Sequence, residues 1–349
     1  MSIRIDENIC TASTLPGSFY CDPKIYEAQK DLVFVPSWQF IDQQAELGET
    51  VPSNLLPGCL DEPIILSRTE EKIHCLSNVC THRAAIIVTE PCKHKTLRCG
   101  YHGRRFRHDG QFVSMPGFQG ACDFPSASDN LPALAHAQLG ALNFVSIKPR
   151  CSFDDWTAPL KAKMPWYDWS GLPAEATQTQ AYEFNANWAL YCDNYLEGLH
   201  VPFVHPGLNQ AIDLQSYDVE IFDWGTVQTA MPSQDEPVFP DGKSAYYFWL
   251  YPNLMLNFYP WGLSVNTVLP QGVDRTRVEF SYFVVDAAKR NIGAGANLEQ
   301  VEMEDEAVVE LVQRGVRSRL YTRGRYSPQH EKSVHRFHQL LARDLVPTI

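Results

Sequence analysis

The first amphipathic pattern in the chain predicts a short helix near the N-terminus. Asp22 is a favourable N-cap, and Pro23 stands at the first helical position, where its missing N–H costs nothing. One mainly apolar stripe follows, formed by Ile25, Ala28, Gln29, Leu32 and Val33. This spacing is typical of a helix with one buried face. We expect the helix to end before Pro36, which cannot continue it.

Beyond this helix, the pattern changes to short apolar and β-branched runs that Gly and Pro interrupt. From Trp38 to about Arg150, runs such as 63–66 and 144–147 predict a small antiparallel β domain. Helical and strand patterns then mix, and a second sheet is predicted with strands at 246–251, 256–259 and 277–285. Residues 297–319 form a charged amphipathic pattern that predicts a helix.

These patterns divide the chain into three parts and indicate the α+β class. We expect an N-terminal helix within residues 1–37, a β domain at 38–150 and a larger domain at 151–349. A length of 349 residues accommodates two domains of this kind. No internal repeat is visible, which excludes repeat architectures.

Composition and charge exclude several classes of protein. The hydrophobic content of 44% is that of a globular chain, and the net charge of −12 disfavours nucleic-acid binding, which needs basic residues against phosphates. No apolar run approaches the roughly 18 residues of a membrane span. Residues 1–14 contain acidic and polar side chains where a signal peptide would be apolar, so we expect a cytoplasmic protein.

Ten cysteines in a cytoplasmic chain are expected to be free thiols or metal ligands. Eight have no ligand-like partner at short range, and we expect structural roles for Cys10, Cys21, Cys59, Cys75, Cys92, Cys122, Cys151 and Cys192. The other two belong to Cys80-Thr81-His82 and Cys99-Gly100-Tyr101-His102, the pattern C-x-H-x16-C-x2-H. Each of these two loops offers one thiolate and one imidazole.

This order of ligands predicts an iron-sulfur cluster of the Rieske type. In such a centre, two thiolates hold one iron of a [2Fe-2S] cluster and two imidazoles hold the other. We therefore assign Cys80, His82, Cys99 and His102 to the cluster. A structural zinc is the alternative, but zinc fingers usually pair Cys with Cys and His with His along the chain. Zinc without iron or sulfide in the native protein would favour that alternative.

A second group of polar residues indicates a mononuclear metal site. Asp193, Glu197 and His200 stand at i, i+4 and i+7 and would share one face of a helix. His205 falls off that face, but Pro202 should divert the chain into a turn that brings His205 back towards His200. A non-haem iron that activates O2 takes two histidines, one carboxylate and open positions. Two histidines alone are more often surface or core residues.

The carboxylate ligand is expected on the helix at 297–319. One stripe of this helix contains Val301, Asp305, Val308 and Val312, whereas the acids on its other faces are Glu302, Glu306 and Glu310. Asp305 would then be a lone acid on an apolar face, which requires a cation. The alternative is a slightly turned helix that exposes Asp305. His335 and His338 lack a spaced acid, and we expect them at the surface or at an interface.

The segments around both sites resemble the Rieske non-haem iron oxygenase family, specifically its alpha subunit. The similarity runs in order through Phe19-Tyr20, 77–83, 99–103, Met115-Pro116, Asn187-Trp188, His200, His205, Pro252-Asn253 and Asp305. It covers nearly the whole chain. The family commonly has glycine at the position of Ala84 and tryptophan at that of Arg104, and these departures bear on loop packing and on the docking surface.

The resemblance implies an antiparallel β Rieske domain and a catalytic domain with a curved antiparallel sheet covered by helices. The N-terminal helix is expected to pack on the catalytic domain. His200, His205 and Asp305 correspond to the iron ligands, and Glu197 and Asn194 to catalytic-site residues. Members usually form trimers in which the cluster of one subunit faces the iron of the next, with the acid at Glu197 bridging the two sites. A glutamate at this position resembles the subgroup that acts on choline, betaine and carnitine.

We therefore expect the oxygenase component of a monooxygenase that uses O2 and electrons from NAD(P)H, supplied through a separate reductase. Hydroxylation at an N-methyl carbon of a small quaternary-ammonium or N-methyl compound would lead to demethylation. The alternatives are an aromatic-ring hydroxylating dioxygenase alpha subunit and an electron-transfer Rieske protein whose second site is degenerate. Iron content distinguishes the electron-transfer protein from an oxygenase, because the former would hold two irons per chain and the latter three.

The electron donor is expected to dock beside the cluster. Residues 91–108 contain no acid and six basic side chains, namely Lys93, Lys95, Arg98, Arg104, Arg105 and Arg107. In an otherwise acidic chain, this segment favours an acidic ferredoxin or a flavin reductase as the partner. A solvated loop surface, or a contact with a neighbouring subunit, is the alternative.

Overall fold

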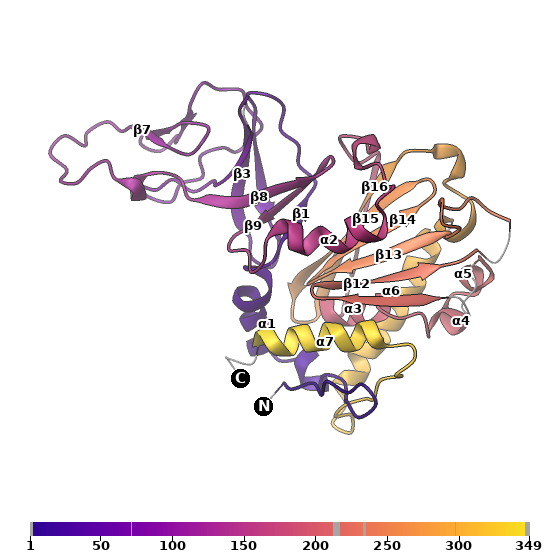
Figure 1. The fold of residues 1–349 in the computed structure, drawn as a ribbon. Helices are drawn as coiled ribbons and strands as arrows, with labels where there is room; N and C mark the ends of the chain where they lie inside the picture. Colours follow the sequence, from indigo (N-terminus) through magenta and orange to yellow (C-terminus); the bar gives the residue numbers. More distant parts are fainter. Residues whose placement is uncertain (1–2, 71, 212–216, 233–234, 297, 346–349) are drawn as a thin grey trace. The chain divides into compact units, whose positions relative to one another are not determined.

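The computed structural model describes residues 3–70, 72–211, 217–232, 235–296 and 298–345. The chain folds into two compact units (Figure 1). One unit consists of Val35–Arg150, and the other combines Met1–Phe34 with Cys151–Ile349. The N-terminal segment therefore belongs to the same unit as the C-terminal half of the chain. Among the described residues, no helix is both long enough and apolar enough to cross a membrane.

The unit Val35–Arg150 contains two antiparallel sheets. The larger sheet has the order β1-β9-β8-β4-β3-β2, with strands Gln39–Ile41 (β1), Thr50–Leu55 (β2), Glu62–Arg68 (β3), Ile73–Ser77 (β4), Ala133–Leu139 (β8) and Leu142–Ser146 (β9). The smaller sheet consists of Leu97–Arg98 (β5), Arg105–Phe106 (β6) and Phe112–Ser114 (β7). The strands predicted at 63–66 and 144–147 are confirmed, because β3 and β9 contain them apart from the last residue of the second run.

The other unit is built on one seven-stranded antiparallel sheet. Its order is β10-β16-β15-β14-β13-β12-β11, with strands Gln178–Phe184 (β10), Asp218–Phe222 (β11), Gly225–Ala230 (β12), Ala245–Leu250 (β13), Leu254–Tyr259 (β14), Gly262–Gly272 (β15) and Arg275–Val284 (β16). Every residue of β12 and β14 is buried. The centre of this sheet is therefore covered on both faces, which explains runs that do not alternate between apolar and polar residues.

Helices complete this unit (Figure 1). Their bounds are Pro23–Gln29 (α1), Phe153–Lys163 (α2), Trp188–Tyr195 (α3), Val201–Val204 (α4), Pro206–Ala211 (α5), Leu298–Val316 (α6) and Lys332–Leu345 (α7), and a π-helical turn at Lys30–Phe34 extends α1. Asp22 caps α1 by accepting a hydrogen bond from the backbone N–H of Lys24 at 2.9 Å, as predicted. Asn297, the first residue of the helix predicted at 297–319, lies outside the described residues.

Aromatic packing fixes α3, the helix that leads into the candidate site. The Trp188 ring lies 5.0 Å from Phe34 and 5.7 Å from Phe337 on α7, measured between centroids. Its indole N–H donates a hydrogen bond to Gln29 Oε1 at 2.8 Å. These contacts join α1, α3 and α7, and α3 also packs against α6 and β15. The α+β class predicted from the sequence is confirmed.

Candidate metal centres

Helix α3 ends at Tyr195, just before the first candidate metal ligand. Gly198 follows in the chain, and glycine destabilises a helix. Glu197 and His200 therefore lie beyond the helix. The prediction that Asp193, Glu197 and His200 share one helical face is wrong for this reason.

Asp193 instead belongs to a buried polar network. It accepts a hydrogen bond from the Tyr20 hydroxyl at 2.8 Å and lies 2.8 Å from His338 Nε2. The Tyr326 hydroxyl lies 2.6 Å from His338 Nδ1. His335 and His338 are 7% and 1% exposed, so the prediction that they lie at the surface or at an interface is wrong. Their helix, α7, packs against α3, β11 and β12, which places these rings inside the unit.

His200 and His205 flank α4, a single helical turn. Pro202 stands in the first turn, where its missing N–H has no helical partner to lose. The backbone N–H of His205 donates to the Val201 carbonyl at 3.0 Å and closes the turn. The two imidazole rings lie 5.2 Å apart. The chain thus brings His205 back beside His200, although Pro202 starts a helical turn here and was expected to prevent one.

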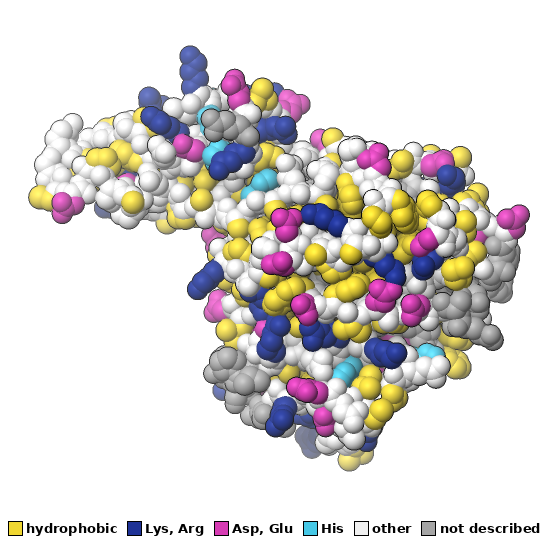
Figure 2. Space-filling model, viewed as in Figure 1, with side chains coloured by type: hydrophobic (Ala, Val, Ile, Leu, Met, Phe, Trp, Pro, Cys, Tyr) yellow, Lys and Arg dark blue, Asp and Glu magenta, His cyan; other side chains and the backbone are white. Residues whose placement is uncertain are grey.

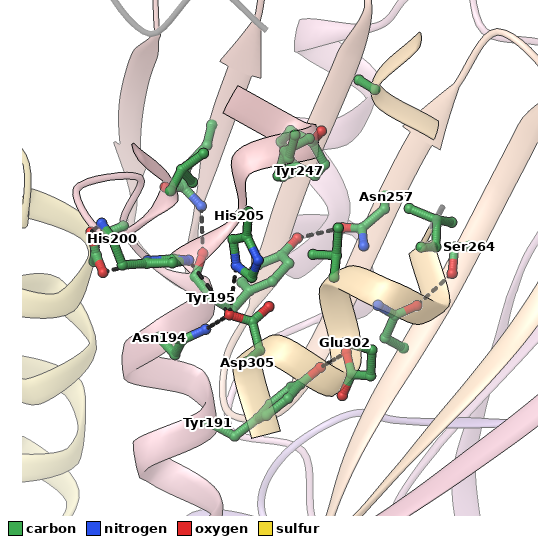
Figure 3. A pocket seen from close by; sticks show the side chains of 18 of the residues that line it. Tyr191, Asn194, Tyr195, His200, His205, Tyr247, Asn257, Ser264, Glu302 and Asp305 are labelled. Carbon is green, nitrogen blue, oxygen red and sulfur yellow. Dashed lines mark hydrogen bonds and ion pairs between the residues drawn. The ribbon is translucent and has the colours of Figure 1, made fainter. Parts of the chain in front are cut away.

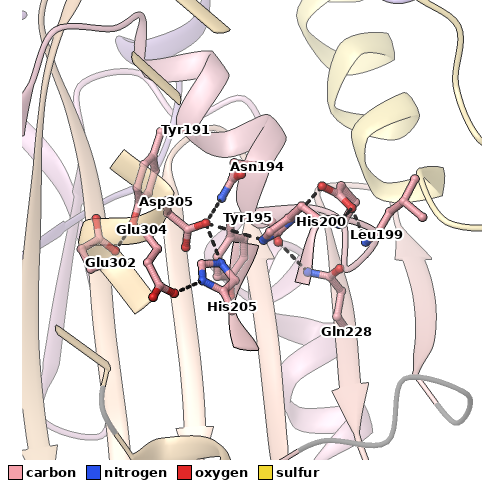
Figure 4. Close-up of polar contacts among 11 residues, drawn as sticks. Tyr191, Asn194, Tyr195, Leu199, His200, His205, Gln228, Glu302, Glu304 and Asp305 are labelled. Carbon is pink, nitrogen blue, oxygen red and sulfur yellow. Dashed lines mark hydrogen bonds and ion pairs between the residues drawn. The ribbon is translucent and has the colours of Figure 1, made fainter. Parts of the chain in front are cut away.

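Asp305 on α6 completes the group (Figure 4). Its Oδ1 atom lies 2.9 Å from His205 Nε2 and 3.5 Å from His200 Nε2. One ligand atom from each of these three residues lies within 4.8 Å of the others. The three side chains are between 1% and 17% exposed. Two imidazoles and one carboxylate at these separations fit a mononuclear iron that keeps open positions.

The buried face of α6 differs from the predicted stripe. Its buried residues are Glu302, Val309, Gln313 and Val316. Val312 is 43% exposed, and Asp305 lies at the edge of the buried face with its side chain 15% exposed. The helix is turned because two polar side chains find partners inside: Glu302 accepts a hydrogen bond from the Tyr191 hydroxyl, and Gln313 accepts one from the Asn187 N–H.

A carboxylate contacts the second ring nitrogen of each histidine. Glu197 Oε1 lies 2.6 Å from His200 Nδ1. Glu304 Oε2 lies 2.7 Å from His205 Nδ1 (Figure 4). Burial lowers the pKa of His205, but its hydrogen bonds with Asp305 and Glu304 outweigh burial and raise the pKa. Carboxylates in this position fix the tautomer and ring orientation of metal-binding histidines. Both Nε2 atoms are thereby held towards Asp305.

Asn194 orients the carboxylate of Asp305, because its Nδ2 atom donates a hydrogen bond to Asp305 Oδ1 at 2.5 Å. The resemblance placed Asn194 at this site, but sequence reasoning did not assign Glu304, Tyr191 or Glu302 to it. Spacing offered a clue in two cases. Tyr191 precedes Asn194 by three residues and Glu302 precedes Asp305 by three, so each shares a helical face with a site residue.

A pocket opens beside the His200, His205 and Asp305 group (Figure 3). It encloses about 850 Å³ of space, part of it open to solvent. Its aromatic lining consists of Tyr191, Tyr195, Tyr217, Tyr247, Tyr259 and Phe280. Burial raises the pKa of Tyr191 and of Tyr195 well above the ordinary value, so these rings stay neutral. A concave site with this lining suits a small organic molecule.

The Cys-x-His and Cys-x2-His motifs form matching loops in the unit Val35–Arg150. In each loop, the cysteine N–H donates to the carbonyl five residues later, at 2.9 Å from Cys80 and at 2.8 Å from Cys99. The two cysteines are 3% and 2% exposed, whereas His102 is exposed and His82 half-buried. The His82 and His102 rings lie 4.8 Å apart. Paired buried thiols and paired accessible imidazoles fit a Rieske cluster with its histidine end outward.

The structure explains the first departure from the family pattern. Ala84 has φ 54°, in the left-handed region that glycine occupies without strain. Gly103 has φ 74° at the equivalent position of the second loop, and both residues donate to the carbonyl of the cysteine four residues earlier. Alanine at position 84 therefore carries a backbone strain that the family's glycine avoids.

The second departure places a charge in the interior. Arg104 is 2% exposed, and its Nη2 atom lies 2.5 Å from Asp129 Oδ1. Its guanidinium carbon lies 4.9 Å from the Phe112 ring centroid, 5.6 Å from Phe124 and 5.8 Å from Phe106. The arginine fills an aromatic site where the family commonly has tryptophan. It cannot belong to a docking surface, and the prediction that it does is wrong.

The predicted basic segment is therefore smaller at the surface than in the sequence. Lys93 Nζ lies 2.5 Å from Glu46 Oε2, an acid from another part of the chain. The exposed basic side chains that remain in this segment are Lys95, Arg98, Arg105 and Arg107. On the face seen in Figure 2, basic side chains lie among acidic ones.

Comparison with known proteins places both units in one family. Residues 37–126 match the Rieske [2Fe-2S] domain, and residues 174–345 match the catalytic domain of the ring hydroxylating alpha subunit. The chain is 32% identical to choline monooxygenase, chloroplastic, of Arabidopsis thaliana, covering 96% of this chain and 83% of the relative. It is 27% identical to the carnitine monooxygenase oxygenase subunit of Escherichia coli (strain K12), covering 97% and 96%.

A solved structure shows the same fold. The quaternary ammonium Rieske monooxygenase CntA, in complex with L-carnitine, matches with a TM-score of 0.78 and 21% identity over 99% of each chain. The similarity to this structure extends over both units of the chain. The curved antiparallel sheet with its helices corresponds to the catalytic domain. The chain therefore belongs to the Rieske non-haem iron oxygenases, and it is an oxidoreductase with a Rieske [2Fe-2S] cluster and a mononuclear iron.

Proposed function

We propose that this chain is the oxygenase component of a monooxygenase that hydroxylates a small quaternary-ammonium or N-methyl compound. One observation carries the proposal: the group formed by His200, His205 and Asp305 opens onto a pocket lined by tyrosines. The relatives act, by name, on choline and carnitine, both of which are quaternary-ammonium compounds. Hydroxylation at an N-methyl carbon would lead to demethylation.

His200, His205 and Asp305 are proposed to hold the mononuclear iron, and Cys80, Cys99, His82 and His102 the cluster. When bound, the iron activates O2 and the cluster supplies an electron. The remaining polar residues position these groups. Glu197 and Glu304 orient the two imidazoles, and Asn194 orients the carboxylate through its amide N–H. None of these three needs to contact the substrate for this role.

The surrounding assembly is also a proposal. A trimer would place the cluster of one subunit beside the iron site of the next, and Glu197 would then bridge His102 and His200 of neighbouring subunits. Glu197 already contacts His200 within its own chain. Electrons would come from NAD(P)H through a separate ferredoxin or flavin reductase, and we keep a cytoplasmic location as a prediction.

Substrate-dependent O2 uptake tests the proposed function. The holoenzyme, supplied with NADH and a compatible reductase, is offered choline, glycine betaine and carnitine in parallel with a set of aromatic acids. We expect O2 uptake coupled to product formation with at least one quaternary-ammonium compound and with none of the aromatic acids. Coupled uptake with aromatic acids alone would instead identify an aromatic-ring hydroxylating enzyme.

A further inference from the structure

Glu302 is a buried carboxylate at the wall of the pocket (Figure 3). It stands on α6, three residues before Asp305, and is 6% exposed. Its Oε2 atom accepts a hydrogen bond from the Tyr191 hydroxyl at 2.7 Å. Its Oε1 atom is buried and has no hydrogen-bond partner among the described residues. A buried carboxylate with one unpartnered oxygen is costly unless a cation or donor arrives from elsewhere.

The pocket supplies no such cation from the chain itself. Its acidic lining residues are Glu197, Glu302 and Asp305, and none of the described lining residues is a lysine or an arginine. Glu197 contacts His200, and Asp305 contacts both metal-ligand histidines. Glu302 has only the neutral Tyr191 hydroxyl. It is therefore the acid of the pocket without a basic partner in the described structure.

The mononuclear metal does not account for Glu302 either. Within the described residues, the set of atoms close enough to share one ion consists of His200, His205 and Asp305, and Glu302 is outside it. Two imidazoles and one carboxylate already form a complete ligand set for an iron that keeps open positions. Burial raises the pKa of Glu302 well above its ordinary value, and the nearby Asp305 and Glu306 add to this effect, so a cation that enters the pocket would favour the ionised form of Glu302.

The walls of the pocket suit a cation without N–H donors. The pocket presents the aromatic residues Tyr191, Tyr195, Tyr259 and Phe280, and aromatic faces attract quaternary ammonium groups. Two of the tyrosine hydroxyls are already engaged, since Tyr195 donates to Asn257 Oδ1 at 2.6 Å and Tyr191 donates to Glu302. The terminal torsion of a glutamate is soft, so a small rotation of its carboxylate would turn Oε1 towards a bound cation.

We propose that Glu302 is the specificity-determining residue that supplies the negative charge opposite the substrate's cationic nitrogen. This inference rests on the proposed function and adds to it the residue that selects a permanent positive charge. Glu302 is buried, and opposite charges attract strongly away from bulk water, so loss of this charge weakens cation binding while leaving the shape of the pocket. A neutral molecule of the same shape gains nothing from Glu302.

Two pairs of probes isolate the charge. Choline and 3,3-dimethylbutan-1-ol share one shape and differ by a cationic nitrogen in place of carbon, as do glycine betaine and 3,3-dimethylbutanoate. Dissociation constants for all four are measured by calorimetry on the iron-loaded holoenzyme, for the wild type and for Glu302→Gln. We expect Glu302→Gln to weaken the better-bound cation about 10- to 100-fold, as for a close charge pair, and its carbon analogue by less than about 3-fold.

Two further variants distinguish the effect of the lost charge from the effect of a folding defect. Glu302→Asp keeps the charge and should retain the preference for the cation at reduced affinity. Glu299→Gln makes the same change one turn earlier on α6, at an exposed acid outside the pocket lining, and should alter none of the four dissociation constants. Equal weakening of both members of a pair by Glu302→Gln, or no weakening, would overturn the role of Glu302. A wild type that binds neither cation better than its carbon analogue would instead overturn the proposed substrate class, and with it this inference.

Discussion

Replacing Arg104 with methionine tests whether a buried charge holds the second cluster loop. Methionine keeps a long unbranched side chain but removes the ion pair with Asp129 and the attraction to the rings of Phe112 and Phe124. Breaking a buried ion pair costs about 3–5 kcal/mol, and the aromatic contacts add roughly 0.5–2 kcal/mol. Asp129 is 17% exposed and regains some hydration. We therefore expect the free energy of unfolding to fall by about 3 kcal/mol.

The assay is urea unfolding of the cluster-loaded protein, followed by the visible absorbance of the cluster. With a typical urea dependence of about 1–3 kcal/mol per molar, this loss lowers the midpoint by roughly 1–3 M. Arg107→Met is the matched control, because Arg107 is an exposed arginine three residues later. It should change the midpoint by less than about 0.5 M, as surface substitutions do. An Arg104→Met midpoint equal to that of the control would refute the reasoning.

Three other substitutions test separate parts of the account. Ala84→Gly should raise the free energy of unfolding by up to about 1 kcal/mol, because it relieves a left-handed backbone, and a lower urea midpoint would contradict this. Glu197→Gln should leave iron and sulfide contents unchanged while turnover falls about 10- to 100-fold, as for other groups that orient metal-bound histidines; normal turnover would exclude the positioning role. Reversing Lys95 and Arg105 to glutamate should slow cluster reduction by the donor and weaken its dependence on ionic strength, whereas unchanged kinetics at low salt would place the donor elsewhere.

The sequence could predict the parts of the site that depend on spacing and ligand chemistry. The pattern of Cys80, His82, Cys99 and His102 is specific because one thiolate and one imidazole recur in each loop. The pairing of His200 with His205 was also predicted, although Pro202 stands in a helical turn and does not divert the chain from one. Both results depend on short stretches of chain, where local geometry decides the outcome.

The parts that could not be predicted depend on partners distant in sequence. Helical periodicity placed Glu302 away from the buried face, but the Tyr191 hydroxyl, 111 positions earlier, stabilises it inside. Arg104 was assigned to a docking surface because it stands among other basic residues beside the cluster, but its partner Asp129 lies 25 positions later. A single sequence does not show such contacts, so buried polar pairs are where pattern-based prediction of this fold fails.

Iron content tests the central claim that this chain holds two separate metal centres. Iron and acid-labile sulfide are measured in the purified holoprotein, together with its visible spectrum, for the wild type and for Asp305→Ala. The wild type should contain three irons and two sulfides per chain, and Asp305→Ala should contain two irons with an unchanged cluster spectrum. Two irons in the wild type, or three in Asp305→Ala, would contradict the assignment of His200, His205 and Asp305 to a mononuclear site.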